Sequence, residues 1–572
     1  MGGREATPRL PSAEVHSTWW ALAVVLVIYC GLTLFRLASA DLASDEGRFG
    51  ISAVNILTDW HQLAIVSENP LGRYATKPFV YPLTIAASIC LFGKNEFAVR
   101  VVNVVVLAAA AFAVFALVRL LFPDRSLPFL TFGAFLLNPW TISYARTAMP
   151  EPELVLWGCV SLYAAAKFYL GGRTGWATLC GLALGLAFLS KIWLVYPFAL
   201  GCSAFFASKL VSGWNRKSVV SCVLAFAVFA LVAGSHLLLA WWLAPETLAD
   251  WIQLYYRVTF KSRVAGEGFD PQMWYLPWYA YWGTIFRASF FALPLVLAGV
   301  YDLAKDANLP TNAVVLSLLS PCLVFSFFRV KQPSYVYPAF PALALLVAYG
   351  VRCYFGRMTR RNLVVASLLS VLAATLFFHL GLFGVASLAV FSILYLFFAA
   401  SGLVPPHLGI AVKRFVACAS ICGMLLAGIM VWRQSLRHRT YYREISSYFA
   451  PALGPYRPQD VVFTAPEFPA IQFYTFRSGQ YWQTYYFHQS LPDFLAGLKS
   501  GSQAFYVVDS SGALYGGKVS EDKLAALRQY AVDVTPEIER SIRHKLGLKV
   551  YVPSQGPRVP NAPFADRQEP RK

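Results

Sequence analysis

Charged residues are scarce in this chain of 572 residues. They make up 13% of the sequence, whereas hydrophobic residues make up 57% and the mean hydropathy is +0.53. A soluble globular domain carries about 25% charged residues. The composition therefore excludes an ordinary soluble protein and predicts a polytopic membrane protein.

Acidic residues are scarcer than basic ones, with 29 Asp and Glu against 48 Lys and Arg, which gives a formal net charge of +19. In a soluble protein this excess would suggest nucleic acid as a partner. Here the basic residues fall mainly in short loops between apolar segments, as the positive-inside rule requires. We therefore expect these basic residues to lie beside a lipid bilayer and not to bind nucleic acid.

Patterns that would bind a metal or form disulfides are also lacking. The ten cysteines lie in or beside apolar segments, and the eight histidines are scattered without H-x-x-x-H spacing. The polar C-terminal region has no Gly-rich phosphate loop and no nucleophile elbow. No cofactor is predicted with certainty, and a divalent metal could be held only by carboxylates such as Asp45 and Glu46.

Long apolar runs are abundant. A bilayer-spanning helix needs about 20 apolar residues, and this template fits roughly thirteen times. A shorter run from Phe79 to Phe92 is typical of an interfacial or re-entrant helix. The predicted spans are 18–37, 96–121, 127–144, 150–170, 175–190, 192–209, 218–243, 286–303, 312–328, 334–355, 362–380, 383–402 and 411–432, with the break at Ser190 and Lys191 the least certain.

Charge predicts the orientation of these spans. If the N-terminus is cytoplasmic, the inside loops hold sixteen Lys and Arg against five Asp and Glu. The loops 41–82 and 244–285 and everything after Arg433 then lie outside the cytoplasm. We expect a multi-pass protein of the cytoplasmic (inner) membrane with an extracytoplasmic C-terminal region.

The region after the last span changes character. Polar sequence contains strand-like runs at 461–463, 504–508 and 548–552 and a helix-like stretch at 522–530, which is typical of a small α/β domain. The predicted domains are a transmembrane domain over 1–435 with functional outer loops 41–95 and 244–285, an extracytoplasmic α/β domain over 436–554, and a disordered tail over 555–572.

Asp45 and Glu46 follow the first span directly. A carboxylate there could be partly desolvated and act as a base or a metal ligand. The pair could equally be a solvated helix N-terminus, because a helical pattern begins here. Both interpretations stay open at this point.

Several cations fall on the predicted outer side. Lys77 precedes Pro78 at headgroup depth, which suits a lipid phosphate or a snorkelling anchor. The 244–285 loop interleaves Arg257, Lys261 and Arg263 with aromatic residues, which suits interfacial anchoring or a phospho-sugar site. Arg329 and Lys331 violate the positive-inside rule, which indicates function.

Arg146 and Glu151 flank the outer end of the third and fourth predicted spans, and Lys191 interrupts an apolar run. Ionisable groups at such depth are expensive to bury and are functional by default. The alternative is a structural ion pair such as Lys191 with Glu151.

Eight motifs resemble, in order, those of bacterial C-type (GT-C) glycosyltransferases of the aminoarabinose–lipid A transferase and protein O-mannosyltransferase group. The resemblance covers residues 40–340 in detail and implies the GT-C fold. The motifs are SDEGRFG, LTDWHQL, YATKPFVYP, LFGKNEFAVR, ARTAMPEP, GLALGLAFLSK, WYLP and VKQPSYVYP.

The resemblance implies an inverting transfer of a sugar from a polyprenyl (undecaprenyl) phosphate carrier to lipid A, another envelope glycan or a protein. It implies catalytic roles for Asp45 and Glu151, with Glu46 as a further candidate beside Asp45. The implied donor-phosphate ligands are Lys77, Lys331, Tyr335 and a long-loop cation, for which Arg263 is the best match and Arg257 and Lys261 are the alternatives. Lys191 matches a buried lysine of the family, and the predicted supporting residues are Arg48, Tyr74, Arg146 and Lys191.

Two departures weaken the metal site that this family implies. Thr76 stands where the aminoarabinose transferases have Glu, and the long loop lacks their His. The alternatives to an enzyme are a lipid or solute transporter and a non-catalytic envelope-assembly subunit. A transporter is disfavoured because no inverted repeat is found and the charges gather at outer span ends.

Overall fold

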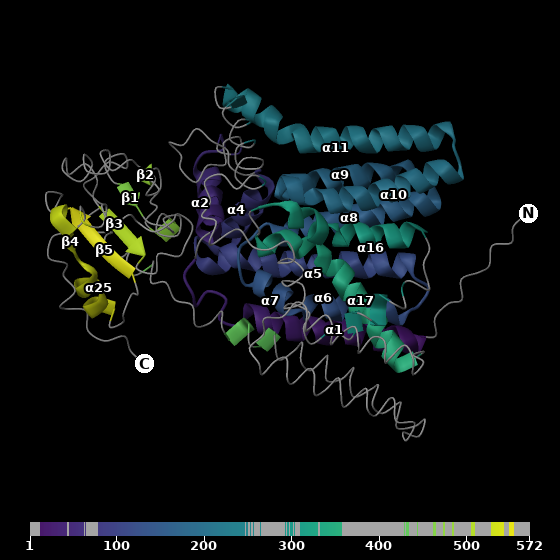
Figure 1. Cartoon of the computed structure of the whole chain (residues 1–572), viewed down its shortest axis with the longest axis horizontal. Coiled ribbons are helices and arrows are strands. Elements are labelled where there is room, and N and C mark those ends of the chain that lie inside the picture. Colours follow the sequence, from purple (N-terminus) through teal and green to yellow (C-terminus); the bar gives the residue numbers. More distant parts are fainter. Residues whose placement is uncertain are drawn as a thin grey trace, which may run out of the picture. The chain divides into compact units, whose positions relative to one another are not determined.

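The computed structural model describes most of the N-terminal 356 residues and parts of the remainder. The described stretches are 12–42, 45–61, 63, 78–245, short runs between 248 and 303, 309–329, 332–356, 428–429, 431–433, 443, 462–464, 473–474, 483–484, 505–509, 525, 528–542 and 548–553. The chain forms two compact units. Figure 1 labels the helices and strands from which they are built. The first comprises 1–35, 103–235 and 258–435, and the second comprises 36–102, 236–257 and 436–572.

The first unit is a bundle of apolar helices. α8 packs against α9 and α10, α10 also packs against α16, and α6 packs against α17. Its elements are α1 (Ser12–Leu34), α6 (Ser126–Leu136), α7 (Pro139–Ala145), α8 (Glu151–Gly171), α9 (Thr174–Ser190), η1 (Ile192–Val195), α10 (Tyr196–Ser212), α16 (Leu309–Val324), η4 (Phe325–Phe327), η5 (Pro333–Ala339) and α17 (Phe340–Gly356). Two long helices, α5 (Glu96–Leu121) and α11 (Arg216–Leu243), begin or end in the second unit.

Five helical segments of the described residues are long and apolar enough to cross a membrane: 96–121, 151–171, 192–212, 216–243 and 334–352. Each coincides with a predicted span. The predicted spans 362–380 and 383–402 lie outside the described residues, as do most of 286–303 and 411–432. The number thirteen therefore stays a prediction.

The predicted span over 127–144 is not one continuous helix. α6 ends at Leu136, and the separate short helix α7 begins at Pro139. Proline has no backbone N–H and cannot continue the helical hydrogen bonds, so it starts a new helix. Asn138 caps that helix, because its Oδ1 accepts a hydrogen bond of 2.9 Å from the Trp140 backbone N–H.

The predicted break at Ser190 and Lys191 is confirmed. α9 ends at Ser190, and Lys191 is extended, with φ −158° and ψ 97°, before the 3-10 turn η1. An interrupted helix frees backbone groups and can turn a side chain away from the helical path. The predicted short helix after Phe79 is also present, as α4 (Val80–Phe92), which packs against α2 (Asp45–Thr58) within the second unit.

A mixed sheet is described in the C-terminal region. Its strand order is β2-β1-β3-β5-β4, with β1 parallel to β2 and β3, and β5 antiparallel to β3 and β4. The strands are β1 (Val462–Thr464), β2 (Gln483–Thr484), β3 (Phe505–Asp509), β4 (Ala531–Asp533) and β5 (Leu548–Pro553), and the helix α25 (Thr535–Ile542) follows β4. The three predicted strands match β1, β3 and β5. The boundaries and outer location of this domain stay predictions.

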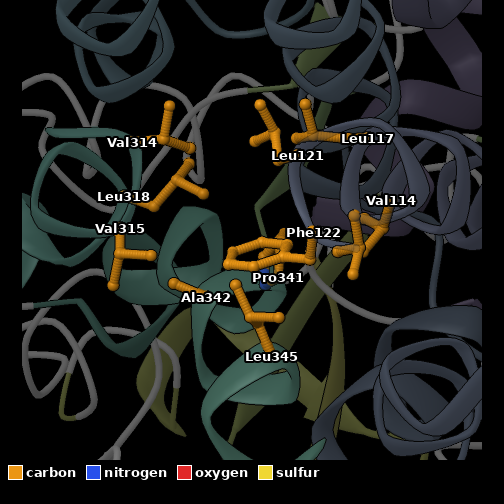
Figure 2. A pocket seen from close by; sticks show the side chains of 11 residues that line it. Val114, Leu117, Leu121, Phe122, Val314, Val315, Leu318, Pro341, Ala342 and Leu345 are labelled. Atoms are coloured by element: carbon orange, nitrogen blue, oxygen red, sulfur yellow. The ribbon is translucent and has the colours of Figure 1, made fainter. Parts of the chain in front are cut away.

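A small apolar pocket of about 20 Å³ lies among α5, α16 and α17 in the first unit (Figure 2). Its lining is aliphatic or aromatic, with Phe122, Leu318 and Leu345 among its residues. Water needs polar partners to occupy so small a cavity. The pocket is therefore a gap in helix packing, and it offers nothing that could bind a phosphate or a sugar.

Close packing in the first unit depends on small residues. A Cβ atom added at Gly181 of α9 would lie 2.1 Å from the backbone oxygen of Ala225 in α11. Ala225 also packs with Phe168 and Ala177 in a buried cluster. Such close approach of two backbones is typical of helix contacts in membranes. The hydrophobic effect does not drive helices together there, so small residues that allow close van der Waals packing take on that role.

We therefore expect Gly181→Ala to force α9 and α11 apart and to destabilise the protein by about 1–3 kcal/mol. Thermal unfolding in detergent, followed by tryptophan fluorescence, measures the effect. Gly175→Ala is the matched control, because nothing lies within 4 Å of a Cβ added there. Equal unfolding temperatures for the two variants would contradict the packing argument.

Candidate functional site

Asp45 begins α2 in the second unit. Its Oδ1 lies 3.4 Å from Arg48 Nη1 one helical turn later, and both side chains are partly exposed. A carboxylate in the first turn is stabilised by the free N–H groups and the dipole of the helix. Asp45 is therefore held in a defined place and still reaches solvent.

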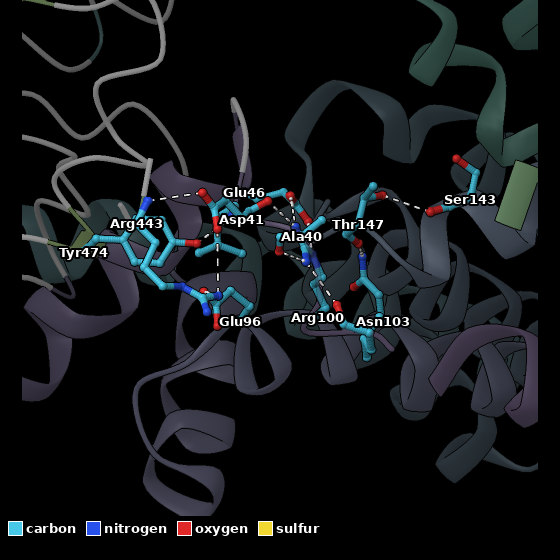
Figure 3. Close-up of polar contacts among 12 residues, drawn as sticks. Ala40, Asp41, Glu46, Glu96, Arg100, Asn103, Ser143, Thr147, Arg443 and Tyr474 are labelled. Atoms are coloured by element: carbon cyan, nitrogen blue, oxygen red, sulfur yellow. Dashed lines mark hydrogen bonds and ion pairs between the residues drawn. The ribbon is translucent and has the colours of Figure 1, made fainter. Parts of the chain in front are cut away.

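Glu46, the next residue, is buried and fully engaged (Figure 3). Arg100 of α5 donates two parallel hydrogen bonds of 2.8 Å to its carboxylate, from Nε to Oε1 and from Nη2 to Oε2. The same guanidinium donates to the backbone oxygens of Leu37 (3.0 Å), Ala40 (2.6 Å) and Asp41 (2.7 Å). This forked pair fixes the chain that leads into α2.

Three predicted residues come together in the first unit. Glu151 stands at the start of α8 with its side chain wholly buried, and Lys191 Nζ donates a hydrogen bond to its Oε1. The same Nζ lies 5.7 Å from the centre of the Tyr335 ring. Glu151 Oε2 has no hydrogen-bond partner among the described residues.

Aromatic rings surround this cluster. The ring of Tyr335 lies 5.5 Å from Trp193 and 5.1 Å from Phe325, centre to centre, and Tyr144 lies 4.2 Å from Tyr337. Rings of this kind lower the local dielectric and strengthen every charge interaction among them. A buried carboxylate with one unused oxygen in such a setting can hold a polar group or a developing positive charge.

Arg146, predicted as a supporting residue, is buried in the first unit and binds the C-terminal end of α1. Its Nη1 donates to the backbone oxygens of Leu32 (3.2 Å), Thr33 (2.9 Å) and Phe35 (3.0 Å). The last carbonyls of a helix have no partner inside the helix, so a cation there is stabilising. The geometry gives Arg146 a supporting role in the fold.

Asn103 is a residue that the sequence alone did not single out. Its Nδ2 donates to the backbone oxygens of Tyr144 (3.2 Å), Thr147 (2.6 Å) and Met149 (2.9 Å), and Figure 3 shows it beside Thr147. These bonds hold the turn that precedes Glu151. An asparagine inside an apolar span is the signal that could have found it.

Four predicted residues, Lys77, Tyr74, Arg263 and Lys331, lie outside the described residues. Within the described stretches, no group of three or more His, Cys, Asp or Glu could hold a metal ion. The carboxylates of Asp45 and Glu46 face Arg48 and Arg100 instead. Paired with these arginines, the two carboxylates do not fit a metal site.

The fold is that of known membrane glycosyltransferases. The crystal structure of ArnT from Cupriavidus metallidurans in the apo state matches with a TM-score of 0.62 and 17% identity, over 94% of this chain and 98% of that chain. The crystal structure of the same protein bound to undecaprenyl phosphate also matches with a TM-score of 0.62. Arabinosyltransferase EmbB from Mycobacterium smegmatis gives 0.52 at 12% identity, over 76% of this chain and 42% of that chain. The chain is a multi-pass membrane protein.

Sequence comparison identifies a matching family model and related proteins. Residues 76–237 match the model of the dolichyl-phosphate-mannose-protein mannosyltransferase family. An undecaprenyl phosphate-α-4-amino-4-deoxy-L-arabinose arabinosyl transferase of Pseudomonas aeruginosa (strain LESB58) is 29% identical over 326 residues, 54% of this chain and 55% of the relative. The corresponding protein of strain UCBPP-PA14 is 28% identical over 59% of this chain and 60% of its own length. The resemblance to C-type, aminoarabinose transferase-like proteins is confirmed, although these matches span little more than half of the curated relatives.

We expect Lys191→Met to destabilise the protein by about 3 kcal/mol, because it leaves the buried Glu151 carboxylate without its cation. The double variant Lys191→Met with Glu151→Gln should recover most of that loss. Thermal unfolding of the single and double variants measures the coupling. Lys167→Met is the control, because Lys167 also lies over aromatic rings, those of Tyr163 and Trp176. If the change in unfolding free energy of the double variant equals the sum of the changes in the two single variants, the ion pair is not supported.

Proposed function

We propose that the protein is an integral-membrane glycosyltransferase that moves a sugar from undecaprenyl phosphate to an acceptor on the outer face of the cytoplasmic membrane. The N-terminus lies in the cytoplasm, and the C-terminal domain lies outside. Lipid A is the acceptor that the arabinosyl transferase relatives favour, and other envelope glycans or a protein are the alternatives.

The cluster of Glu151, Lys191 and Tyr335 carries this proposal. The resemblance implies functional roles at these positions, and the described side chains lie together in the first unit. Glu151 and Lys191 also fall inside the segment that matches the mannosyltransferase model. Support for the donor comes from ArnT, whose structure has been determined bound to undecaprenyl phosphate.

The reaction is a single displacement at the anomeric carbon of the sugar, with inversion. An acceptor oxygen forms the new bond to this carbon, and the bond to the phosphate oxygen breaks, so the electron pair leaves with undecaprenyl phosphate. Lys77, Arg263 and Lys331 stabilise the charge that develops on the phosphate. Tyr335 donates a hydrogen bond to it, and Glu151 opposes the positive charge on the sugar ring.

Asp45 acts on the acceptor. If the acceptor is a hydroxyl, its proton passes to the Asp45 carboxylate as the new bond forms. If the acceptor is a phosphate monoester, with a second pKa of roughly 6, it is already ionised and Asp45 only positions it. Glu46 holds the start of α2 through Arg100, and its two bonds to this arginine support a structural role for it in this proposal.

The sugar is the part of the proposal that relatives support least. Thr76 replaces the glutamate that aminoarabinose transferases have before Lys77. We infer that the donor pocket differs near the phosphate, and that the sugar need not be 4-amino-4-deoxy-L-arabinose. The first donor to test is still undecaprenyl phosphate-α-4-amino-4-deoxy-L-arabinose, followed by undecaprenyl phosphate-linked hexoses.

Asp45→Asn should lower kcat by about 10³-fold or more with a hydroxyl acceptor, because the general base is lost. With a phosphate acceptor the loss should be about 10-fold, since no proton needs to be removed. Release of undecaprenyl phosphate from the purified protein in nanodiscs measures both. Asp59→Asn, in an exposed turn beyond α2, is the matched control. Full activity of Asp45→Asn with both acceptors contradicts the assignment.

Lys77→Ala and Lys331→Ala should each lower kcat/KM by about 10²-fold or more with every acceptor, because each removes a cation from the leaving phosphate. Lys217→Ala, at the exposed start of α11, should leave kcat/KM unchanged. Wild-type turnover in either loop variant would refute the donor-phosphate assignment. A transporter, by contrast, would release no undecaprenyl phosphate from any donor.

A further inference from the structure

Two carboxylates of the second unit share one arginine from the C-terminal region (Figure 3). Asp41, just before α2, and Glu96, at the start of α5, have side chains that are 9% and 8% exposed. Arg443 binds Glu96 Oε1 through Nη2, which also lies 3.8 Å from Asp41 Oδ1, and its backbone N–H donates to Asp41 Oδ2 at 3.1 Å. Without Arg443, two nearly buried negative charges would lose the cation that they share.

A second contact from the same region lies beside this one. The hydroxyl oxygen of Tyr474 accepts a hydrogen bond of 2.8 Å from the Leu42 backbone N–H. The ring of Phe473 is buried against α2, so closely that a Cβ added at Gly50 would lie 2.9 Å from its Cδ2. The Arg443 guanidinium lies 5.8 Å from the centre of the Tyr474 ring, which joins the two contacts.

The charges in this cluster reinforce one another. Burial alone would lower the pKa of the Arg443 guanidinium, but the carboxylates of Glu96 and Asp41 raise it above its usual value. Burial raises the pKa of Tyr474 well above its usual range, and Asp41 and Glu96 raise it further. A raised pKa favours the protonated form of both groups.

These contacts bracket Asp45 along the chain. Asp41 and Leu42 lie four and three residues before it, and Gly50 lies five residues after it on α2. Arg100 fixes the same segment from α5 through Glu46 and the backbone oxygen of Asp41. Side chains from the far end of the sequence therefore contact the chain on both sides of Asp45.

We propose that Arg443, Phe473 and Tyr474 form a clamp that positions Asp45 for the reaction without touching the substrate. This inference rests on the proposed function, in which Asp45 acts on the acceptor. It gives the C-terminal region a catalytic purpose, because a displacement of about 1 Å in a reacting group can cost about 100-fold in rate.

Arg443→Ala should lower kcat by about 100-fold while the KM for the undecaprenyl phosphate-linked donor changes by less than about 2-fold, since the donor ligands are left in place. Arg443→Lys should retain part of the activity, and added guanidinium ion should partly rescue Arg443→Ala. Lys549→Ala is the matched control, because it removes a 3.0 Å ion pair with Asp533 in the same region.

Glu96→Gln tests the shared charge. Combined with Arg443→Ala it removes one of the two carboxylates that the arginine neutralised, so the double variant should be more active than Arg443→Ala alone. Tyr474→Phe should lower kcat by about 10-fold, because the Leu42 N–H then has no acceptor from Tyr474. Wild-type kcat in both Arg443→Ala and Tyr474→Phe would overturn the clamp.

Hydrogen exchange separates failure of the clamp from failure of the proposed function. In Arg443→Ala the backbone amides of 41–50 should exchange faster, whereas those of α8 should not change. This result supports the clamp even if the wild-type protein transfers no sugar. Unchanged exchange at 41–50, or a loss of kcat matched by a lower unfolding temperature and not rescued by lysine or guanidinium, would overturn it.

Discussion

A buried charge near the end of a membrane helix must find a partner, because an unpaired ion in a medium of low dielectric costs several kcal/mol. This constraint organises both units. Arg146 donates hydrogen bonds to backbone carbonyls at the end of α1. Arg100 donates hydrogen bonds to Glu46 and to three backbone carbonyls. The two arginines therefore bind backbone carbonyls at the end of α1 and in the turn that follows it.

The same constraint separates structural charges from charges suited to chemistry. Both oxygens of Glu46 are bound by one planar guanidinium, an arrangement that resists exchange with a substrate. Glu151 is different, because a single lysine nitrogen binds one oxygen and the other has no partner among the described residues. Lysine provides a point charge on a flexible stem, so the Glu151 pair can rearrange when a ligand enters.

Sequence patterns predicted the features that depend on local composition. Apolar runs located α5, α8 and α11, and the polar interruption at Lys191 located the end of α9. The break before α7 was missed because hydropathy does not register that Pro139 lacks a backbone donor. Arg100, Asn103 and Arg443 were missed as well, since their partners lie between 41 and 402 residues away along the chain. Charge type was visible in the sequence, but pairing across such distances was not.

The C-terminal region contributes side chains to the compact unit that also holds residues 36–102. The domain boundary between 435 and 436 stays a prediction. Within this unit Arg443 binds Asp41, just before α2, and Glu96, the first residue of α5. Arg443 thus supplies a cation to two acids that lie more than 340 residues before it in the chain.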